Sequence, residues 1–195
     1  MKYQHSGIEI NRYNYVYVKE YKRELFKNIA KVFDTYKIRY VISHGNLIEF
    51  ERKLPIIQDD DIDIRFNIHD FTKWMKYCKS LKNRIDKENN LIFDDRIINF
   101  KQQLYNGIQC RLNNFISPIK NINYKGNIHC DIIVNKAGMN HFWKDYPVFH
   151  EPLRKIKYYG IDTYAPSKKL TRYILTKQYG KNYIYPIVDY STIRW

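Results

Sequence analysis

The chain has 195 residues and carries 34 basic against 20 acidic side chains, a formal net charge of +14. This length predicts one domain, and 44% hydrophobic with 28% charged residues is typical of a soluble globular protein. No stretch approaches the ~20 apolar residues of a transmembrane helix, and the first residues lack the apolar core of a signal peptide.

The basic residues are spread along the chain without a run of five or more. An anionic nucleotide or an anionic surface fits this charge, and we do not expect a nucleic-acid partner. The three cysteines are odd in number and far apart, which predicts reduced thiols rather than a disulfide framework: Cys78, Cys110 and Cys130. We therefore expect a reducing compartment and a cytoplasmic protein, with association with a membrane surface left open.

The N-terminal part divides into an arm and a helix. Residues 1–17 are polar and rich in Tyr, which indicates a loosely docked arm, and residues 18–195 are expected to form a single domain. Residues 18–36 are the clearest helix, because apolar side chains recur there at helical spacing with Lys and Glu between them. A short β-prone run at residues 39–42 follows.

A glycine turn comes next. The run from Ser43 to Asn46 leads into a short helix that extends to Arg52. Gly45 would let the backbone approach a phosphate closely, and the unpaired N–H groups at a helix N-terminus attract an anion. These residues therefore predict a phosphate site.

The most informative stretch is the acidic run at residues 58–66. If it is a strand, its side chains alternate between two faces, with Ile62, Ile64 and Phe66 on the face that can pack into a core. The charged residues then share the other face: Asp59, Asp61, Asp63 and Arg65. Two carboxylates ~4 Å apart repel by roughly 4 kcal/mol at an effective dielectric near 20. Such a cluster favours a bound divalent cation, Mg²⁺ or Mn²⁺.

Two alternatives explain the acids without catalysis. The run can be an acidic turn that leads into a strand, with its carboxylates in water. An EF-hand loop also has acids at the spacing of Asp59, Asp61 and Asp63, but it needs Gly where Ile64 stands and Glu where Asp70 stands.

The middle of the chain continues as a mixture of helix and strands. A second helix is expected at about 69–82, with Asp70 as its N-cap, and a loop at 83–89. Three β-like runs follow, with Asn106-Gly107 as a hairpin signal before the last: residues 91–93, 97–100 and 108–112. Residues 113–127 indicate a loop, and residues 128–134 a strand in which Asp131 is a lone acid among apolar neighbours.

The last third is expected to hold a hairpin and a helix. Residues 137–150 predict an irregular connection, and Leu153 to Ile161 a hairpin. A helix then starts with Ser167 as N-cap and ends at Tyr179, with Gly180 as its C-cap.

At this point the chain resembles a family. The run from His44 to Ile48, Arg52 and the run from Asp59 to Ile64 are similar to the signature of LicD-type phosphotransferases and their fukutin relatives. That family belongs to the nucleotidyltransferase superfamily typified by DNA polymerase β. The run from Pro166 to Asn182 resembles the family's closing motif, so the resemblance spans about residues 20–186.

The motif differs from the family pattern at a few positions. Asn46 stands where the family has Thr, Glu49 where it has Gly, and Ile57-Gln58 where it has Pro-Trp. The connector to the acids is also one residue shorter. We expect these differences to touch the acceptor or nucleotide pocket more than the metal site.

The resemblance implies an α+β fold: a nucleotidyltransferase-like mixed β-sheet flanked by helices, with a C-terminal helical and hairpin extension. It implies transfer of a phospho-alcohol, of the phosphocholine or ribitol or glycerol phosphate type, from a CDP-linked donor to a glycan hydroxyl, with Mg²⁺ or Mn²⁺ as cofactor. Asp61, Asp63 and Asp131 would be catalytic and would bind the metal together with Asp59. The donor's phosphate would be bound by three further residues: Gly45, Asn46 and Arg52.

Other interpretations stay open. An edge position or a salt bridge also explains Asp131, whereas the resemblance makes it the third metal carboxylate and the acceptor's base. The superfamily includes enzymes that add nucleotides to RNA, so a nucleotidyltransferase or binding protein that acts on RNA is one alternative. A non-catalytic relative kept as an interaction protein is another.

Overall fold

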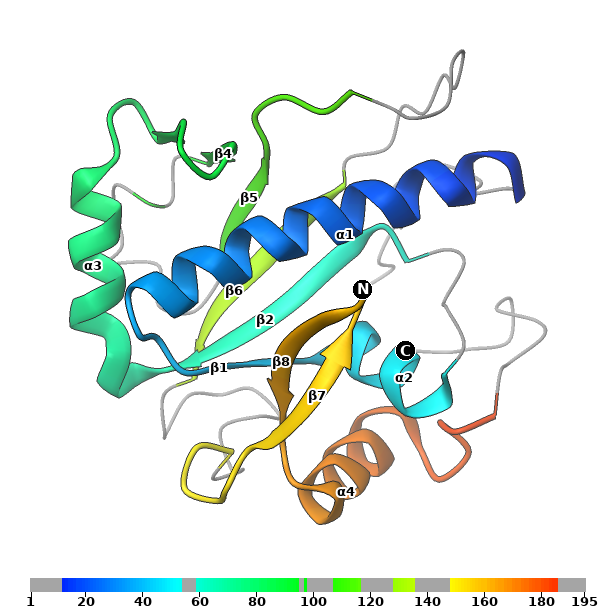
Figure 1. The fold of residues 1–195 in the computed structure, drawn as a ribbon. Helices are drawn as coiled ribbons and strands as arrows, with labels where there is room; N and C mark the ends of the chain where they lie inside the picture. The colour runs from blue at the N-terminus through cyan, green and yellow to red at the C-terminus, as the bar shows by residue number, and fades with distance from the viewer. Residues whose placement is uncertain are drawn as a thin grey trace, which may run out of the picture.

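The computed structural model describes residues 12–53, 59–94, 97, 107–116, 128–135 and 148–185. Its elements follow in this order: α1 (Arg12–Thr35), β1 (Tyr40–Ile42), α2 (His44–Arg52), β2 (Asp61–Asn67), the 3₁₀ turn η1 (Ile68–Asp70), α3 (Phe71–Ser80), β3 (Ile85–Asp86), β4 (Leu91–Phe93), β5 (Ile108–Leu112), β6 (His129–Asn135), β7 (Arg154–Tyr158), β8 (Ile161–Ala165) and α4 (Lys168–Tyr179). Figure 1 shows their arrangement.

Six of these strands form one mixed sheet in the order β1-β2-β6-β5-β4-β3. Strands β2 and β6 are parallel, and the other neighbouring pairs are antiparallel. Helices flank the sheet, which confirms the expected α+β class (Figure 1). The parallel pair places two strands that are far apart in sequence side by side in the interior of the sheet.

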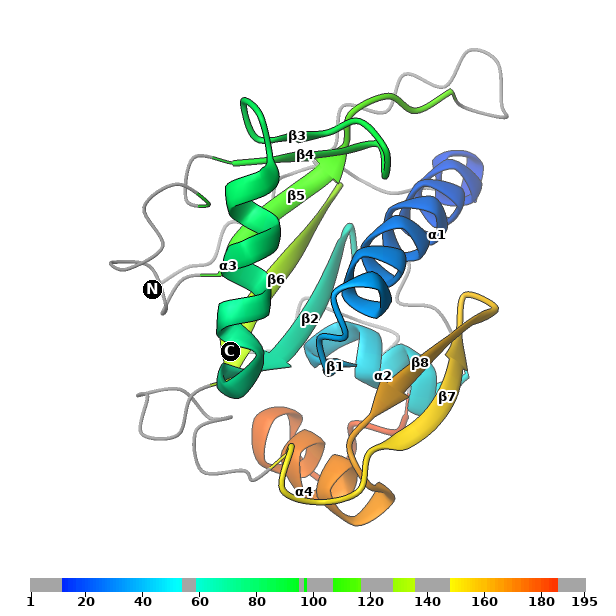
Figure 2. The same ribbon diagram turned by 60° about the vertical axis from the view of Figure 1, so that its left-hand side comes forward.

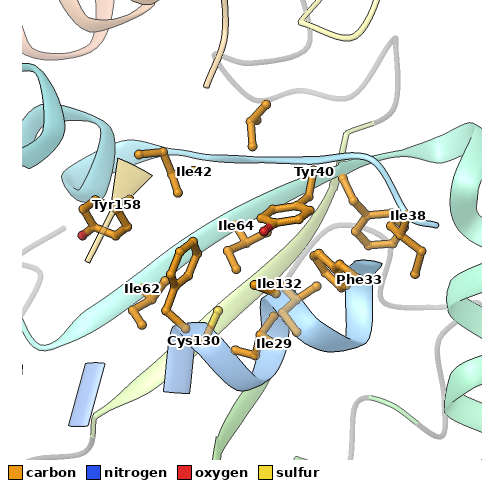
Figure 3. Close-up of a cluster of buried hydrophobic side chains, with 14 of the residues drawn as sticks. Ile29, Phe33, Ile38, Tyr40, Ile42, Ile62, Ile64, Cys130, Ile132 and Tyr158 are labelled. Atoms are coloured by element: carbon orange, nitrogen blue, oxygen red, sulfur yellow. The ribbon is translucent and has the colours of Figure 1, made fainter. Parts of the chain in front are cut away.

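Helix α1 runs diagonally across one face of this sheet (Figures 1 and 2). Alternation along β2 and β6 turns the apolar side chains toward the helix, where Ile62, Ile64 and Ile132 are at most 1% exposed. Figure 3 shows them facing Ile29 and Phe33 of α1. The apolar layer that was expected from the alternation in residues 58–66 is therefore observed, and the charged side chains of β2 lie on the other face.

The C-terminal extension has the expected hairpin and helix. Strands β7 and β8 pair through a turn in which Tyr159 (φ 51°) and Gly160 (φ 78°) are both left-handed, as tight two-residue hairpins require. Helix α4 begins where the Ser167 side chain accepts a hydrogen bond from the Leu170 N–H at 3.3 Å. It ends at Tyr179 with Gly180 as its C-cap, so both expected caps are present.

Some boundaries differ from the expectation. Helix α1 starts at Arg12, so residues 12–17 of the expected arm are helical; Tyr15 and Tyr17 pack beside Val18 and Ile128, which stabilises this part of the helix. The expected loop at 83–89 contains the short strand β3. The strand expected at 97–100 and the loops expected at 113–127 and 137–150 lie largely outside the described residues.

The cysteines are free thiols, as expected: Cys110 and Cys130 are buried, and Cys78 is partly buried. Asp70 precedes α3, but its carboxylate accepts hydrogen bonds from the Arg39 N–H and the Lys73 ammonium rather than capping the helix. Among the described residues, no helix combines the length and the apolar composition needed to cross a membrane.

Candidate metal centre

The acids of β2 meet a second set of ionisable residues on β6. Because the two strands are parallel and in register, Asp63 lies directly beside Asp131, and Asp61 beside His129. Residues paired in this way point to the same face of a sheet. We call the four residues the acidic patch: Asp61, Asp63, His129 and Asp131. The structure thus brings together the three carboxylates that were expected to be neighbours.

The acidic patch has donor atoms at the spacing of a metal site. One donor atom each from Asp61, His129 and Asp131 lie within 4.8 Å of one another. The Oδ1 atom of Asp131 is buried and has no hydrogen-bond partner among the described residues. A buried oxygen without a hydrogen-bond partner destabilises the folded protein. A bound cation that takes oxygen ligands would remove this cost by coordinating the oxygen. The residues present therefore fit a divalent cation.

The electrostatics of the acidic patch favour the same ligand. Burial, with the nearby charges of Asp63 and Asp59, raises the pKa of Asp61 to about 10. Burial, with the charges of Asp59 and Asp131, raises the pKa of Asp63 to about 8, although Arg65 and Lys22 act in the opposite direction. The carboxylates therefore resist ionisation together until a positive charge binds among them.

Two of the expected metal ligands, Asp63 and Asp59, lie outside that group of donor atoms, although Asp63 is the register partner of Asp131. Asp59 precedes β2, and its carboxylate accepts a hydrogen bond from the ammonium of Lys22 at 3.0 Å. Burial lowers the pKa of Lys22, but the charges of Asp59, Tyr159 and Glu49, together with the hydrogen bond to Asp59, outweigh burial and raise the pKa above normal. Lys22 also donates to the Asp59 carbonyl oxygen at 3.1 Å. This pair joins α1 to the start of the acidic strand.

Gly45 was expected to let the backbone approach a phosphate, and the structure shows a different role for it. A Cβ atom on this residue would lie 3.2 Å from Oδ2 of Asp59, closer than a side chain is normally tolerated. The missing side chain therefore makes room for the carboxylate of Asp59. The expected contact of Gly45 with a phosphate has no support in this geometry, because a carboxylate occupies the space beside it.

Asn46 was expected to bind the donor's phosphate, and its position contradicts this. The side chain is fully buried, its Oδ1 accepts from the Asp63 N–H at 2.5 Å, and its Nδ2 donates to the Asp61 carbonyl at 3.4 Å. Nδ2 also donates to the Tyr158 hydroxyl at 3.0 Å, which in turn donates to Glu49 Oε2 at 2.5 Å. Through these hydrogen bonds Asn46 instead stabilises the backbone of β2 between Asp61 and Asp63.

Two of the positions that differ from the family pattern therefore support the acidic strand from the interior. Glu49 is 7% exposed and belongs to the same buried hydrogen-bond network as Asn46. We expected these differences to touch the acceptor or nucleotide pocket more than the metal site, whereas Asn46 bonds directly to the backbone of the strand that carries Asp61 and Asp63. Ile57 and Gln58, the remaining differences, lie outside the described residues.

Arg52 lies at the end of α2 away from the glycine turn. It is the last residue of α2, about 12 Å along the helix axis from the glycine turn, and its Nε donates to the Tyr183 carbonyl. Arg52 thus joins α2 to the segment after α4, and its expected contact with a phosphate is not supported. His44 contacts polar groups through both ring nitrogens: Nδ1 lies 3.1 Å from Ser43 Oγ, and Nε2 3.2 Å from Arg65 Nη2.

Sequence reasoning missed His129 as a member of the acidic patch. In a strand, Cys130 points into the core, where it is fully buried, whereas His129 shares the face of Asp131 two residues later. The same alternation that identified the acids of β2 could have identified His129.

The buried network gives a test of how β2 is held. Tyr158→Phe removes the hydroxyl that joins Asn46 to Glu49, and we expect it to lower the free energy of unfolding by about 1–3 kcal/mol, because buried polar groups lose a partner. Thermal and urea unfolding measure this change. Tyr185→Phe is the control, since Tyr185 is 67% exposed. Equal stability of the two variants would contradict the assigned network.

No protein-family model matches this chain, and no curated protein matches it. The resemblance to LicD-type phosphotransferases consequently stays a proposal that rests on the motif residues themselves. The geometry of the acidic patch is independent of that resemblance.

Proposed function

We propose that the protein is a metal-dependent transferase of the LicD type with a nucleotidyltransferase fold. It would move a phospho-alcohol from a CDP-linked donor to a glycan hydroxyl. The observation that carries this proposal is the pairing of Asp63 on β2 with Asp131 on the parallel strand β6. Helix α2, which begins at the glycine turn just before β2, supports the same assignment.

The described residues have complementary roles in this reaction. Asp61, Asp63 and Asp131 would hold Mg²⁺ or Mn²⁺, which neutralises charge on the transferred phosphoryl group when bound. Asp131 is also the candidate base for the acceptor hydroxyl, through a carboxylate oxygen that does not bind the metal. Asn46 keeps Asp61 and Asp63 in place through the backbone of β2.

A thermal-shift panel with Mg²⁺ tests the donor class. The ligands are CDP-choline, CDP-ribitol, CDP-glycerol, CTP, ATP, UDP-sugars and a short RNA. We expect a CDP-alcohol to stabilise best: at 100 times its dissociation constant a ligand adds roughly 2.7 kcal/mol, which for a chain of this length is about 5–10 °C. Release of CMP from the stabilising donor then tests turnover.

The shift should shrink sharply when EDTA replaces Mg²⁺ and in Asp63→Asn, because the donor's diphosphate would bind through the metal. CDP alone should give part of the shift if the preferred alcohol is absent from the panel. If RNA or ATP stabilised the protein and no cytidine nucleotide did, the alternative of a protein that acts on RNA would replace phospho-alcohol transfer.

A further inference from the structure

We infer that His129 is a direct metal ligand and that it makes this site prefer Mn²⁺ to Mg²⁺. The inference rests on the proposed metal site and adds the identity of its ion. His129 lies at the start of β6 in register with Asp61, one position along the same face from Asp131. Its Nε2 is 3.7 Å from Asp131 Oδ1, and its side chain is only 15% exposed.

The spacing of the donor atoms fits one ion. Ligands at about 2.1 Å around an octahedral cation lie about 3 Å apart when adjacent and about 4.2 Å apart when opposite. The donor atoms of Asp61, His129 and Asp131 already lie within 4.8 Å of one another. Small side-chain rotations would therefore bring all three into contact with a cation, without movement of the two strands.

His44 is the other imidazole near these acids, since its Nδ1 is 3.6 Å from Asp63 Oδ1. Both of its ring nitrogens, however, already lie within hydrogen-bond distance of other groups, Ser43 Oγ and Arg65 Nη2. Arg65 is buried, and a cation at this nitrogen would face its guanidinium charge. His129 is the imidazole whose donor nitrogen lies within 4.8 Å of donor oxygens of both Asp61 and Asp131.

An imidazole ligand changes which ion binds. Mg²⁺ strongly prefers oxygen ligands, whereas first-row transition ions bind imidazole nitrogen well. Mn²⁺ accepts carboxylate and phosphate oxygens as well as nitrogen. Two carboxylates with one imidazole therefore favour Mn²⁺ over Mg²⁺, which three carboxylates alone would not.

The test measures metal binding to the full chain without any donor. Calorimetric titration should give Mn²⁺ an affinity about tenfold or more above that of Mg²⁺. Pulsed electron paramagnetic resonance of the Mn²⁺ complex should detect coupling to an imidazole nitrogen. In His129→Asn we expect the Mn²⁺ affinity to fall about tenfold or more, the Mg²⁺ affinity to change little, and the nitrogen coupling to disappear.

Two controls separate the histidines. His44→Asn should keep the nitrogen coupling, and so should His69→Asn, because His69 is exposed on η1. Unfolding in EDTA shows whether each variant is folded, and His129→Gln is a second substitution at the same site. The wild-type spectrum tests the inference even if neither variant at position 129 folds.

Nitrogen coupling that is absent from wild type with Mn²⁺ bound, or that persists in a folded His129 variant, would overturn the inference. In that case a donor shift that still needs Mg²⁺ leaves the proposed transferase intact. Failure of the wild type to bind either ion would overturn both the inference and the proposed metal site.

Discussion

Asp61→Asn and Asp63→Asn are each expected to reduce metal-dependent turnover of a CDP-linked donor about 10³-fold or more while the protein stays folded. A metal ion contributes several kcal/mol of transition-state stabilisation in such reactions, and about 4 kcal/mol corresponds to three decades in rate. An amide in place of either carboxylate removes the charge that holds the ion. Chromatographic detection of CMP release measures the change.

The control is Asp162→Asn, because Asp162 is 84% exposed and pairs only with the exposed Lys157 among the described residues. It should turn over the donor at the wild-type rate. Turnover at the wild-type rate by either Asp61→Asn or Asp63→Asn would refute the metal-site assignment.

The same two variants should gain stability when no metal is present. The pKa of Asp63 is raised from an ordinary 3.8 to about 8 and that of Asp61 to about 10, so the unfolded chain releases these protons first as the pH rises. The free energy of unfolding of the metal-free protein therefore falls from about pH 4 upward, through pH 8. An amide cannot ionise and avoids this loss.

Thermal unfolding in EDTA measures that gain. At pH 8 each amide variant should melt above wild type, and at pH 4 the advantage should vanish. Addition of Mn²⁺ at pH 8 should stabilise wild type more than either variant. If both variants were clearly less stable than wild type in EDTA at pH 8, structural salt bridges would explain these acids better than a metal site.

Lys22→Met should cause a large loss of stability, about 3 kcal/mol. The Lys22 side chain is 2% exposed and its ammonium is 3.0 Å from Asp59 Oδ2. Removal of one partner from a buried pair leaves the other charge without compensation, at a cost of about 3–5 kcal/mol. Asp59 is 18% exposed, so water partly solvates its carboxylate and we expect a loss near the lower end of this range, about 3 kcal/mol. In thermal unfolding this is a shift of about 6–12 °C.

Lys27→Met is the matched control on the same helix. Lys27 pairs with Glu24, and both side chains are largely exposed, so we expect a change below about 1 kcal/mol. The double variant Lys22→Met/Asp59→Asn should recover part of the loss, because it removes the uncompensated carboxylate. A loss no greater in Lys22→Met than in Lys27→Met would contradict a structural role for this ion pair.

Local periodicity was enough to predict much of the fold. Apolar residues at helical spacing predicted α1, and alternation in residues 58–66 predicted which face of β2 is buried, since both patterns depend only on neighbours in the chain. The caps of α4 at Ser167 and Gly180 were predictable for the same reason. The start of α1 was not, because Tyr15 and Tyr17 are stabilised by Ile128, which is far away in the sequence.

The sequence by itself determined that Asp61 and Asp63 share one face of a strand whose other face is buried, because side-chain alternation is a local property of the backbone. The tertiary structure alone decided what surrounds them. The register of β2 against β6 places Asp131 and His129 beside these acids, Lys22 pairs with Asp59, and Tyr158 donates to Glu49 in the buried network that includes Asn46. Each of these contacts joins residues that are distant in the chain, and no local pattern specifies which distant residues will meet.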